Sequence, residues 1–486
     1  MPQIARRSLA PLALIALLHG ATAVAQQVAP PPSRPGVTPV AASDTTPAGR
    51  ILREVHDHQH ALADLEHLAD GIGPRLTGSD RLLAAHAWAE STLVARGFTS
   101  VHREAYAFGP SWTRGVASAR LLAPGAGTLS LAQMGWSPAT AGPVRGDAML
   151  VTARNDAEMQ ALFGTFRGRV LLFGDLPPLS GPGVDTAAAG ALRAPLTRAM
   201  RDEGALAVLL PSGKETGLNM TGSPTWRRPL VPVVPVAFVE TRDYERVHRA
   251  LLRGERVPLE LNLSGALSPA PVQAFNTVAE LRGSERPDEV VVIGAHIDSW
   301  DLGTGATDNG TGVAAAMEAL RAIQAAGLHP RRTVRVVLFS GEEQGLWGSK
   351  AYVAAHAAEL DRIQAVLIDD LGTGRIRGWA LQGREDVRPY VARAIAPLND
   401  MGVRELPLER SSDSDHAPFV EAGVPAFFAV QDTVDYFSTT HHSQYDTFDH
   451  VRPADLLQGA GALAVTAWEL ANMPERLPHA PAVRKP

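Results

Sequence analysis

Histidine and carboxylate side chains follow the ends of several β-like stretches in the carboxyl-terminal half of the chain. They are His296 and Asp298, Asp308, Glu342 and Glu343, Asp369 and Asp370, and His441 and His442. Because functional groups collect in the loops beyond the carboxyl ends of parallel strands, we expect these side chains to lie at one sheet edge. Imidazole and carboxylate groups together suit zinc and neighbouring metals. The pattern therefore predicts a metal-dependent catalytic site.

The local spacing of these residues has a mechanical meaning. In an extended chain, the side chains of His296 and Asp298 lie on the same side, so Asp298 is expected to orient the imidazole of His296. The adjacent side chains of Glu342 and Glu343 diverge, so one can bind a metal while the other faces the reacting water. Two neighbouring acids after a buried strand are costly without a cation or solvent to receive them. Ordinary solvated acids are the alternative for any one loop, but the set as a whole favours a metal site.

The composition excludes several other chemistries. None of the 486 residues is cysteine, which excludes thiol nucleophiles, disulfide bonds, Cys-bound zinc and iron–sulfur clusters. The chain carries 45 Lys and Arg against 51 Asp and Glu, a net charge of −6. This charge argues against a nucleic-acid partner, because binding to a polyanion needs a basic surface. No Gly-x-Ser-x-Gly sequence follows a strand, so we do not expect a serine hydrolase.

Strands that alternate with helices in residues 268–473 predict the scaffold of the site. Nearly unbroken β-branched and apolar runs indicate strands that are buried on both faces, and 3- to 4-residue apolar spacing indicates helices. The expected strands are 289–293, 333–339, 364–368 and 426–430, and the expected helices are 311–326, 349–358, 387–398 and 453–471. The sequence therefore predicts an α/β fold with a mostly parallel sheet and helices on both faces.

The amino-terminal part divides into segments of different character. Arg6 and Arg7 precede a short apolar stretch, and Ala23-Val24-Ala25 offers small residues at the spacing of a cleavage site. We expect residues 1–25 to be a signal peptide cut near Ala25, which predicts a secreted or periplasmic protein. Residues 26–49 are expected to be a flexible linker, because they are rich in Pro and Thr. No later stretch reaches 18 clean apolar residues, so no integral membrane span is expected.

The pattern of apolar residues and turn residues changes again between residues 106 and 267. Residues 50–105 have a helical pattern and belong with the catalytic domain 268–473, whereas 106–267 shows short β-like runs separated by Gly- and Pro-rich loops. No cluster of candidate catalytic residues lies between 106 and 267. We therefore expect a small inserted α/β domain that covers the cleft, followed after the catalytic domain by a tail at 474–486.

Three stretches of the sequence resemble the signatures of the M28 family of dinuclear zinc exopeptidases. They are His296 to Gly312 (HIDSWDLGTGATDNGTG), Ser340 to Gly345 (SGEEQG) and His442 to Thr447 (HSQYDT). The Ser299-Trp300-Asp301 insertion most resembles the branch of secreted and lysosomal dipeptidases. The likeness covers residues 50 to about 473 and implies a zinc exopeptidase fold. The insert resembles a protease-associated domain in texture only.

This resemblance implies a role for each candidate residue. His296, Asp308 and Asp370 would hold one Zn²⁺ ion, and Asp308, Glu343 and His442 would hold a second, with Asp308 as the bridge. Glu342 would be the general base, and Asp298 would orient a ligand. Asp369 and His441 are the alternatives to their neighbours Asp370 and His442. Asn309 stands where the family usually has a second Asp, and the Asp308–Asn309 peptide is expected to be cis.

The implied activity is hydrolysis of dipeptides or short peptides at a terminus. An aminopeptidase that acts on longer peptides is the alternative within the same class, and a binding protein with a decayed metal site is the alternative outside it. The resemblance also suggests a homodimer. A roofed cleft predicts a cationic group near the substrate carboxylate, supplied by the insert or a partner subunit, with Arg227 and Arg228 beside Trp226 as candidates.

Overall fold

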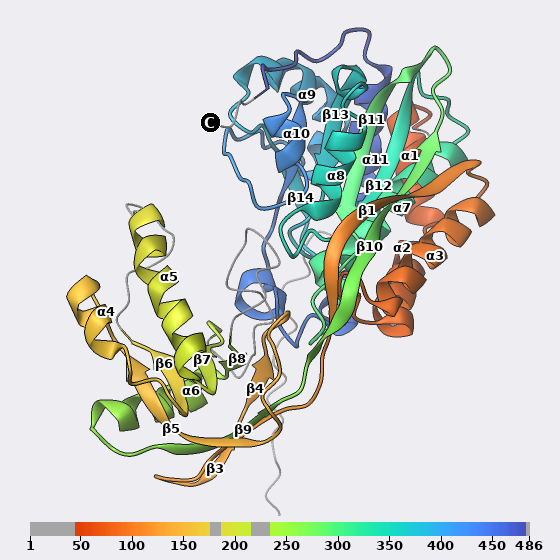
Figure 1. Cartoon of the computed structure of the whole chain (residues 1–486). Coiled ribbons are helices and arrows are strands. Elements are labelled where there is room, and N and C mark those ends of the chain that lie inside the picture. The colour runs from red at the N-terminus through yellow and green to blue at the C-terminus, as the bar shows by residue number, and fades with distance from the viewer. Residues whose placement is uncertain (1–43, 175–185, 215–233, 483–486) are drawn as a thin grey trace, which may run out of the picture. The chain divides into compact units, whose positions relative to one another are not determined.

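The computed structural model describes residues 44–174, 186–214 and 234–482, and two β-sheets organise them (Figure 1). The predicted signal peptide, residues 26–43 of the predicted linker, the last four residues and the candidates Arg227 and Arg228 lie outside the described residues. Within the described ranges, no helix combines the length and the apolar composition that crossing a membrane requires.

A seven-stranded sheet carries the predicted site. Its strands lie in the order β1-β10-β12-β11-β13-β15-β14. Their bounds are β1 (Ser100–Thr113), β10 (Ala266–Leu281), β11 (Arg286–His296), β12 (Arg332–Phe339), β13 (Ile363–Ile368), β14 (Ile376–Ala380) and β15 (Ala426–Gln431). The four strands expected from the sequence are β11, β12, β13 and β15.

The sheet is mixed, so the prediction of a mostly parallel sheet is wrong. The four expected strands do run parallel, with β11 between β12 and β13 and β15 beside β13. The strands outside them pair antiparallel, β10 with β12, β1 with β10, and β14 with β15. Short connections reverse the chain between β10 and β11 and between β13 and β14, so β10 and β14 run opposite to the four central strands, and β1 runs opposite to β10.

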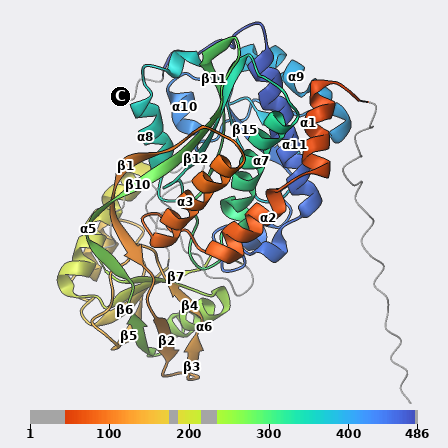
Figure 2. The same cartoon turned by 90° about the vertical axis from the view of Figure 1, so that its right-hand side faces the viewer.

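Helices cover both faces of this sheet. The side chains of a strand alternate between the two faces, so the apolar side chains on each face pack against helices. Val291 and Ile293 of β11 belong to the larger core together with residues of α1, α7 and α11. Val290 and Val292 point to the other face, where the core includes residues of α8 and α10 (Figure 2). The helices are α1 (Pro47–Asp57), α2 (Ala61–Glu66), α3 (Asp80–Ala95), α7 (Thr311–Ala325), α8 (Trp347–Ala355), α9 (Arg388–Ile395), α10 (Ala417–Glu421) and α11 (Pro453–Asn472).

A second, eight-stranded sheet is formed by strands between residues 117 and 263. Its order is β3-β2-β9-β5-β6-β7-β8-β4, and β5, β6, β7 and β8 run parallel. The strands are β2 (Ala117–Leu121), β3 (Gly127–Leu129), β4 (Leu131–Gln133), β5 (Val144–Val151), β6 (Arg169–Phe173), β7 (Ala207–Pro211), β8 (Val236–Val239) and β9 (Pro258–Leu263), and the helices are α4 (Asp156–Leu162), α5 (Thr186–Glu203) and α6 (Thr241–Leu252). Two apolar cores of its own flank this sheet.

Two long paired strands connect the sheets. β1 pairs with β10 over almost its whole length, from Ser100 opposite Glu280 to Thr113 opposite Ala266. The chain therefore leaves the seven-stranded sheet and returns to it through neighbouring strands. We refer to residues 106–267 as the insert; its standing as a separate protease-associated-like domain stays a prediction.

Candidate metal centre

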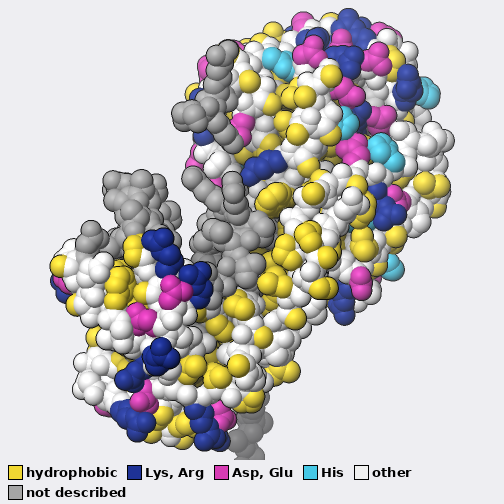
Figure 3. Space-filling model, in the orientation of Figure 1, with side chains coloured by type: hydrophobic (Ala, Val, Ile, Leu, Met, Phe, Trp, Pro, Cys, Tyr) yellow, Lys and Arg dark blue, Asp and Glu magenta, His cyan; other side chains and the backbone are white. Residues whose placement is uncertain are grey.

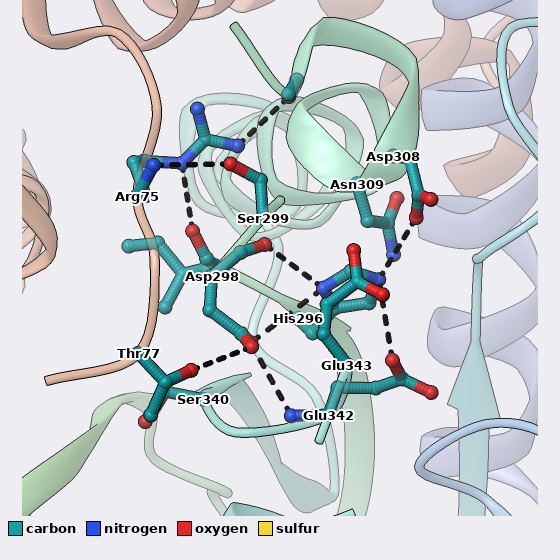
Figure 4. Close-up of polar contacts among 12 residues, drawn as sticks. Arg75, Thr77, His296, Asp298, Ser299, Asp308, Asn309, Ser340, Glu342 and Glu343 are labelled. Atoms are coloured by element: carbon teal, nitrogen blue, oxygen red, sulfur yellow. Dashed lines mark hydrogen bonds and ion pairs between the residues drawn. The ribbon is translucent and has the colours of Figure 1, made fainter. Parts of the chain in front are cut away.

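The candidate residues come together at the carboxyl ends of the parallel strands. His296 ends β11, Glu342 and Glu343 follow β12, and Asp370 follows β13. Asp308 lies in the turn before α7, and His442 follows the turn Tyr436–Thr440. All of these side chains are buried, although the carboxylates and imidazoles are polar. Figure 4 shows several of them pointing toward one another.

Asp308 lies between the two histidines, with one carboxylate oxygen facing each. Its Oδ1 is 3.3 Å from Nε2 of His296, and its Oδ2 is 3.5 Å from Nε2 of His442. His296 Nε2 also lies 3.1 Å from Oδ1 of Asp370, while His442 Nε2 lies 2.9 Å from Oε2 of Glu343. The structure thus forms two groups of nitrogen and oxygen atoms that share one carboxylate. The Asp308–Asn309 peptide is cis, as expected.

The neighbouring alternatives differ in how they face this cluster. Asp370 contacts His296 through one oxygen and accepts a 2.6 Å hydrogen bond from Ser414 through the other. Burial, followed by the charge of Asp370, raises the pKa of Asp369 to about 7. His441 stacks on His442 at 3.7 Å between ring centroids, and an atom of each lies within 4.8 Å of an Asp308 oxygen. Asp370 contacts His296 directly, whereas both histidines lie close to Asp308, so the choice of His442 over His441 stays a prediction.

Asp298 contacts His296 mainly through its backbone. Nδ1 of His296 lies 3.0 Å from the carbonyl oxygen of Asp298 and 3.6 Å from its carboxylate. The carboxylate accepts hydrogen bonds from Thr77 Oγ1 at 2.8 Å and from the backbone N–H of Glu342 at 3.4 Å (Figure 4). Asp298 therefore links the loops after β11 and β12 and, through its carbonyl, fixes the ring of His296.

Arg75 holds the loop between His296 and Asp308 and was not predicted from its residue type. It is fully buried and donates to the carbonyl oxygens of Ile297 at 2.7 Å, Thr304 at 2.8 Å and Gly305 at 2.8 Å. Burial lowers its pKa to about 10, and nearby carboxylates oppose that shift. Nothing local in the sequence indicated which carbonyl groups the guanidinium would meet.

Asp446 and Asn309 fix the remaining side of the Asp308 loop. Oδ1 of Asp446 accepts hydrogen bonds from the backbone N–H of Thr307 at 2.6 Å and its hydroxyl at 2.8 Å. Asn309 donates from Nδ2 to the carbonyl oxygen of Asp369 at 2.8 Å and accepts from the N–H of Gly312 at 3.0 Å through Oδ1. The second bond caps the start of α7. An ionised Asp at this position could not make the first bond, because it has no donor.

The insert contacts this region through the Ser299-Trp300-Asp301 stretch. Arg114 donates to both carboxylate oxygens of Asp301, at 2.9 and 2.7 Å. The Trp300 ring packs edge-on against His442, with 6.0 Å between centroids, and against Trp136 of the insert at 6.3 Å. This aromatic chain covers one side of His442.

The electrostatics of the cluster suit the binding of cations. Burial is the largest cause that raises the pKa of Glu342 and of Glu343 well above the ordinary value, and neighbouring carboxylates add to it. Burial disfavours the charged form of His296, but Asp370 and Glu342 outweigh it, so the pKa of His296 is raised well above its usual range. Among the described residues, the buried atoms Asp308 Oδ2 and Glu343 Oε1 have no hydrogen-bond partner. Bound cations would satisfy these atoms, so the residues fit a metal.

A cavity of about 910 Å³ opens onto the cluster. Asp308, Glu342, Glu343, Asp370 and His442 form part of its wall. Apolar side chains, including Phe428, Val430, Tyr436 and Phe437, form another part, and Glu409 and Asp413 lie in the wall as well. A small molecule with apolar and polar parts fits such a space.

The comparisons with known proteins agree with this arrangement. The model of peptidase family M28 matches residues 276–467. The chain is 32% identical over 413 residues to carboxypeptidase Q of Xenopus laevis, which covers 84% of this chain and 85% of that relative. The crystal structure of a peptidase M28 precursor from Shewanella amazonensis SB2B is similar with a TM-score of 0.75 and 29% identity, covering 89% of this chain and 98% of that one.

The chain belongs to peptidase family M28 and is a metallo-exopeptidase. Within the family it is similar to carboxypeptidase Q over most of both lengths. A zinc aminopeptidase from Bacillus subtilis has the same fold, with a TM-score of 0.63 at 19% identity, and covers 86% of this chain and 98% of that one.

Proposed function

We propose that the protein is an exported zinc exopeptidase that hydrolyses dipeptides or short peptides. His296, Asp308 and Asp370 would hold one zinc ion, and Asp308, Glu343 and His442 would hold the second. The observation that carries this proposal is the placement of Asp308, whose two oxygens face His296 at 3.3 Å and His442 at 3.5 Å. When bound, a zinc pair would supply Lewis acidity to a peptide carbonyl and to water.

The side chains around this pair have separate tasks in the proposed reaction. Glu342 lines the cavity, and its Oε2 lies 3.9 Å from His296 Nε2, so it is placed beside the ligands. It would take a proton from the attacking water and deliver it to the leaving amine. Asp298 would hold the Glu342 backbone and the His296 ring, which keeps base and ligand in a fixed relation. The apolar wall of the cavity would exclude bulk water from the reacting groups.

Metal analysis combined with one substitution tests the assignment. We expect the wild-type protein to bind two zinc equivalents and to hydrolyse unblocked dipeptides. E342Q should keep both equivalents but lose at least about 100-fold in turnover, since the change removes a base and no ligand. Wild-type-like turnover of the zinc-saturated variant would refute the role of Glu342. Failure of the zinc-saturated wild type to cleave any dipeptide would refute the proposed function.

A matched substrate panel distinguishes this function from the aminopeptidase alternative. We expect a free dipeptide to be cleaved faster than its N-acetylated or C-amidated forms, and faster than internal bonds of casein. Preference for longer peptides with a free amino terminus and indifference to the other end would favour the aminopeptidase. The predicted signal peptide is tested by the amino terminus of the exported protein, and the predicted homodimer by light scattering of the purified protein.

A further inference from the structure

A buried ammonium group of the insert lies against the loop that carries His442. Lys214 follows β7, and only 8% of its surface is exposed. Its Nζ donates a 2.8 Å hydrogen bond to the carbonyl oxygen of Phe437, in the turn Tyr436–Thr440 that leads to His441 and His442. A cation from one sheet is therefore placed at the catalytic edge of the other.

The backbone of Lys214 is fixed on both sides. Its carbonyl oxygen accepts a 2.6 Å hydrogen bond from Thr241 Oγ1 at the start of α6, and its N–H donates to Ser212 Oγ at 3.4 Å. The N–H of Ser212 in turn donates to the carbonyl of Val239 at the end of β8, at 2.8 Å. This anchoring lowers the entropy lost when the side chain binds a ligand.

The ammonium of Lys214 has fewer partners than it can use. A lysine ammonium has three N–H donors, and the Phe437 carbonyl accepts from one. Among the described residues, no carboxylate lies within the 4.0 Å ion-pair distance of this Nζ. Burial lowers the pKa of Lys214, and the charge of Asp308 opposes that shift. A buried charge without a counter-ion is costly, so an incoming anion would be stabilised here.

The ammonium of Lys214 is hydrogen-bonded to Phe437, which forms part of the wall of the catalytic cavity. Tyr436 and Phe437 line the same cavity as the catalytic cluster, and the Phe437 ring lies 5.5 Å from that of His441. In a dipeptide, the carboxylate is only one residue, about 4 Å, beyond the scissile bond. A carboxylate bound at this part of the cavity wall would therefore suit a dipeptide better than a long chain.

We propose that Lys214 is a specificity-determining residue that binds the free α-carboxylate of a dipeptide substrate. This inference rests on the proposed function and deepens it, because it assigns the carboxyl end of the substrate to one side chain of the insert. It also replaces Arg227 and Arg228 as the expected source of the cation with a described residue. Figure 3 shows other Lys and Arg side chains spread over the outer surface of the insert, where water screens them.

The test compares K214M, K214R and wild type on alanyl-leucine and on alanyl-leucinamide, all with saturating zinc. Loss of a charged hydrogen bond predicts that K214M loses about 10- to 150-fold in kcat/KM on the free dipeptide, mainly through KM. The amide should be hydrolysed at the wild-type rate, so the selectivity for a free carboxylate collapses. K214R keeps the charge and should recover part of that selectivity. R249M, which changes an exposed cation on α6, is the matched control.

The possible outcomes distinguish the role of Lys214 from the proposed dipeptidase function. Equal losses on the dipeptide and its amide would show that Lys214 only supports the loop, and unchanged selectivity would show that it does not touch the carboxylate; either result overturns the inference. Zinc content and unfolding temperature of K214M exclude misfolding as the cause of a loss. A wild-type protein that cleaves neither substrate would refute the proposed function instead.

Discussion

Replacing Arg75 by methionine should loosen the metal loops and lower stability together. The substitution keeps the apolar stem but leaves the carbonyl oxygens of Ile297, Thr304 and Gly305 without their donor. Each buried acceptor left unsatisfied costs about 1–3 kcal/mol. The relief from no longer burying a guanidinium, whose pKa falls to about 10, returns roughly 3 kcal/mol. We expect a net loss of about 3 kcal/mol in the free energy of unfolding.

Thermal unfolding and metal titration together measure this effect. The wild type, R75M and R81M are compared with zinc and after removal of zinc, with the exposed Arg81 of the same region as control. R75M should unfold several degrees below the wild type in both states. It should also bind zinc more weakly, because the loop that carries Asp308 has lost its anchor. R81M should match the wild type, since surface substitutions usually change stability little.

Two results would contradict the reasoning about Arg75. If R75M unfolds at the wild-type temperature, the three carbonyl oxygens find water or other donors and the guanidinium is not what holds the loop. If R75M is destabilised but binds zinc as tightly as the wild type, the loop geometry does not depend on this anchor.

Three further perturbations have direct readouts. H442A should lose one zinc equivalent measured by elemental analysis while H441A keeps both, and full occupancy of H442A would remove it from the ligand set. Chelation should lower the unfolding temperature, and zinc at about 1,000 times its Kd should restore roughly 4 kcal/mol; an unchanged temperature would show that no metal binds the folded state selectively. Glu104 accepts a hydrogen bond from His356 at 3.0 Å, and this bond raises the pKa of His356. Burial of Glu104 raises its pKa, but the hydrogen bonds and charges of neighbouring histidines, with His356 the largest contributor, together outweigh burial, so the pKa of Glu104 is lowered. E104Q should therefore destabilise the protein most where Glu104 and His356 are both charged, by about 1 kcal/mol near pH 5.5 in urea unfolding. The difference in stability between E104Q and the wild type should vanish as the pH rises through the raised pKa of His356. An equal difference at pH 8.5 would refute the pairing.

The central strands could be predicted because their signal is local. The runs in β11, β12, β13 and β15 are mostly apolar, and each is followed by polar residues that have no role inside a sheet. The outer strands could not be predicted in the same way. β1 mixes charged, aromatic and Gly-Pro positions, and its partner β10 lies more than 150 residues further along the chain. Their antiparallel pairing is a tertiary contact, and no periodicity within either segment encodes it.

The same distinction applies to the residues of the site. The candidate ligands could be named because each is a metal-binding type at the end of a strand or in a loop beyond one, and the structure places their nitrogen and oxygen atoms a few ångströms apart. Arg75 and Lys214 could not be assigned, since long basic side chains are usually exposed and their burial depends on partners more than 200 residues away. Asp298 shows a third case, in which the spacing placed the residue correctly but the nearest contact came from its carbonyl.

The pairing of Thr113 with Ala266 brings together the two ends of the segment 114–265, which makes up most of the insert. Opposed residues of an antiparallel ladder have Cα atoms only about 5 Å apart, so a two-residue turn could join them directly. Residues 114–265 could then be removed or exchanged without changing the path of any strand that carries a metal ligand candidate. Recombination at this graft point would keep the metal ligand candidates but exchange the side chains that contact their loops, such as Arg114, Trp136 and Lys214, which gives the scaffold a simple route to new substrates.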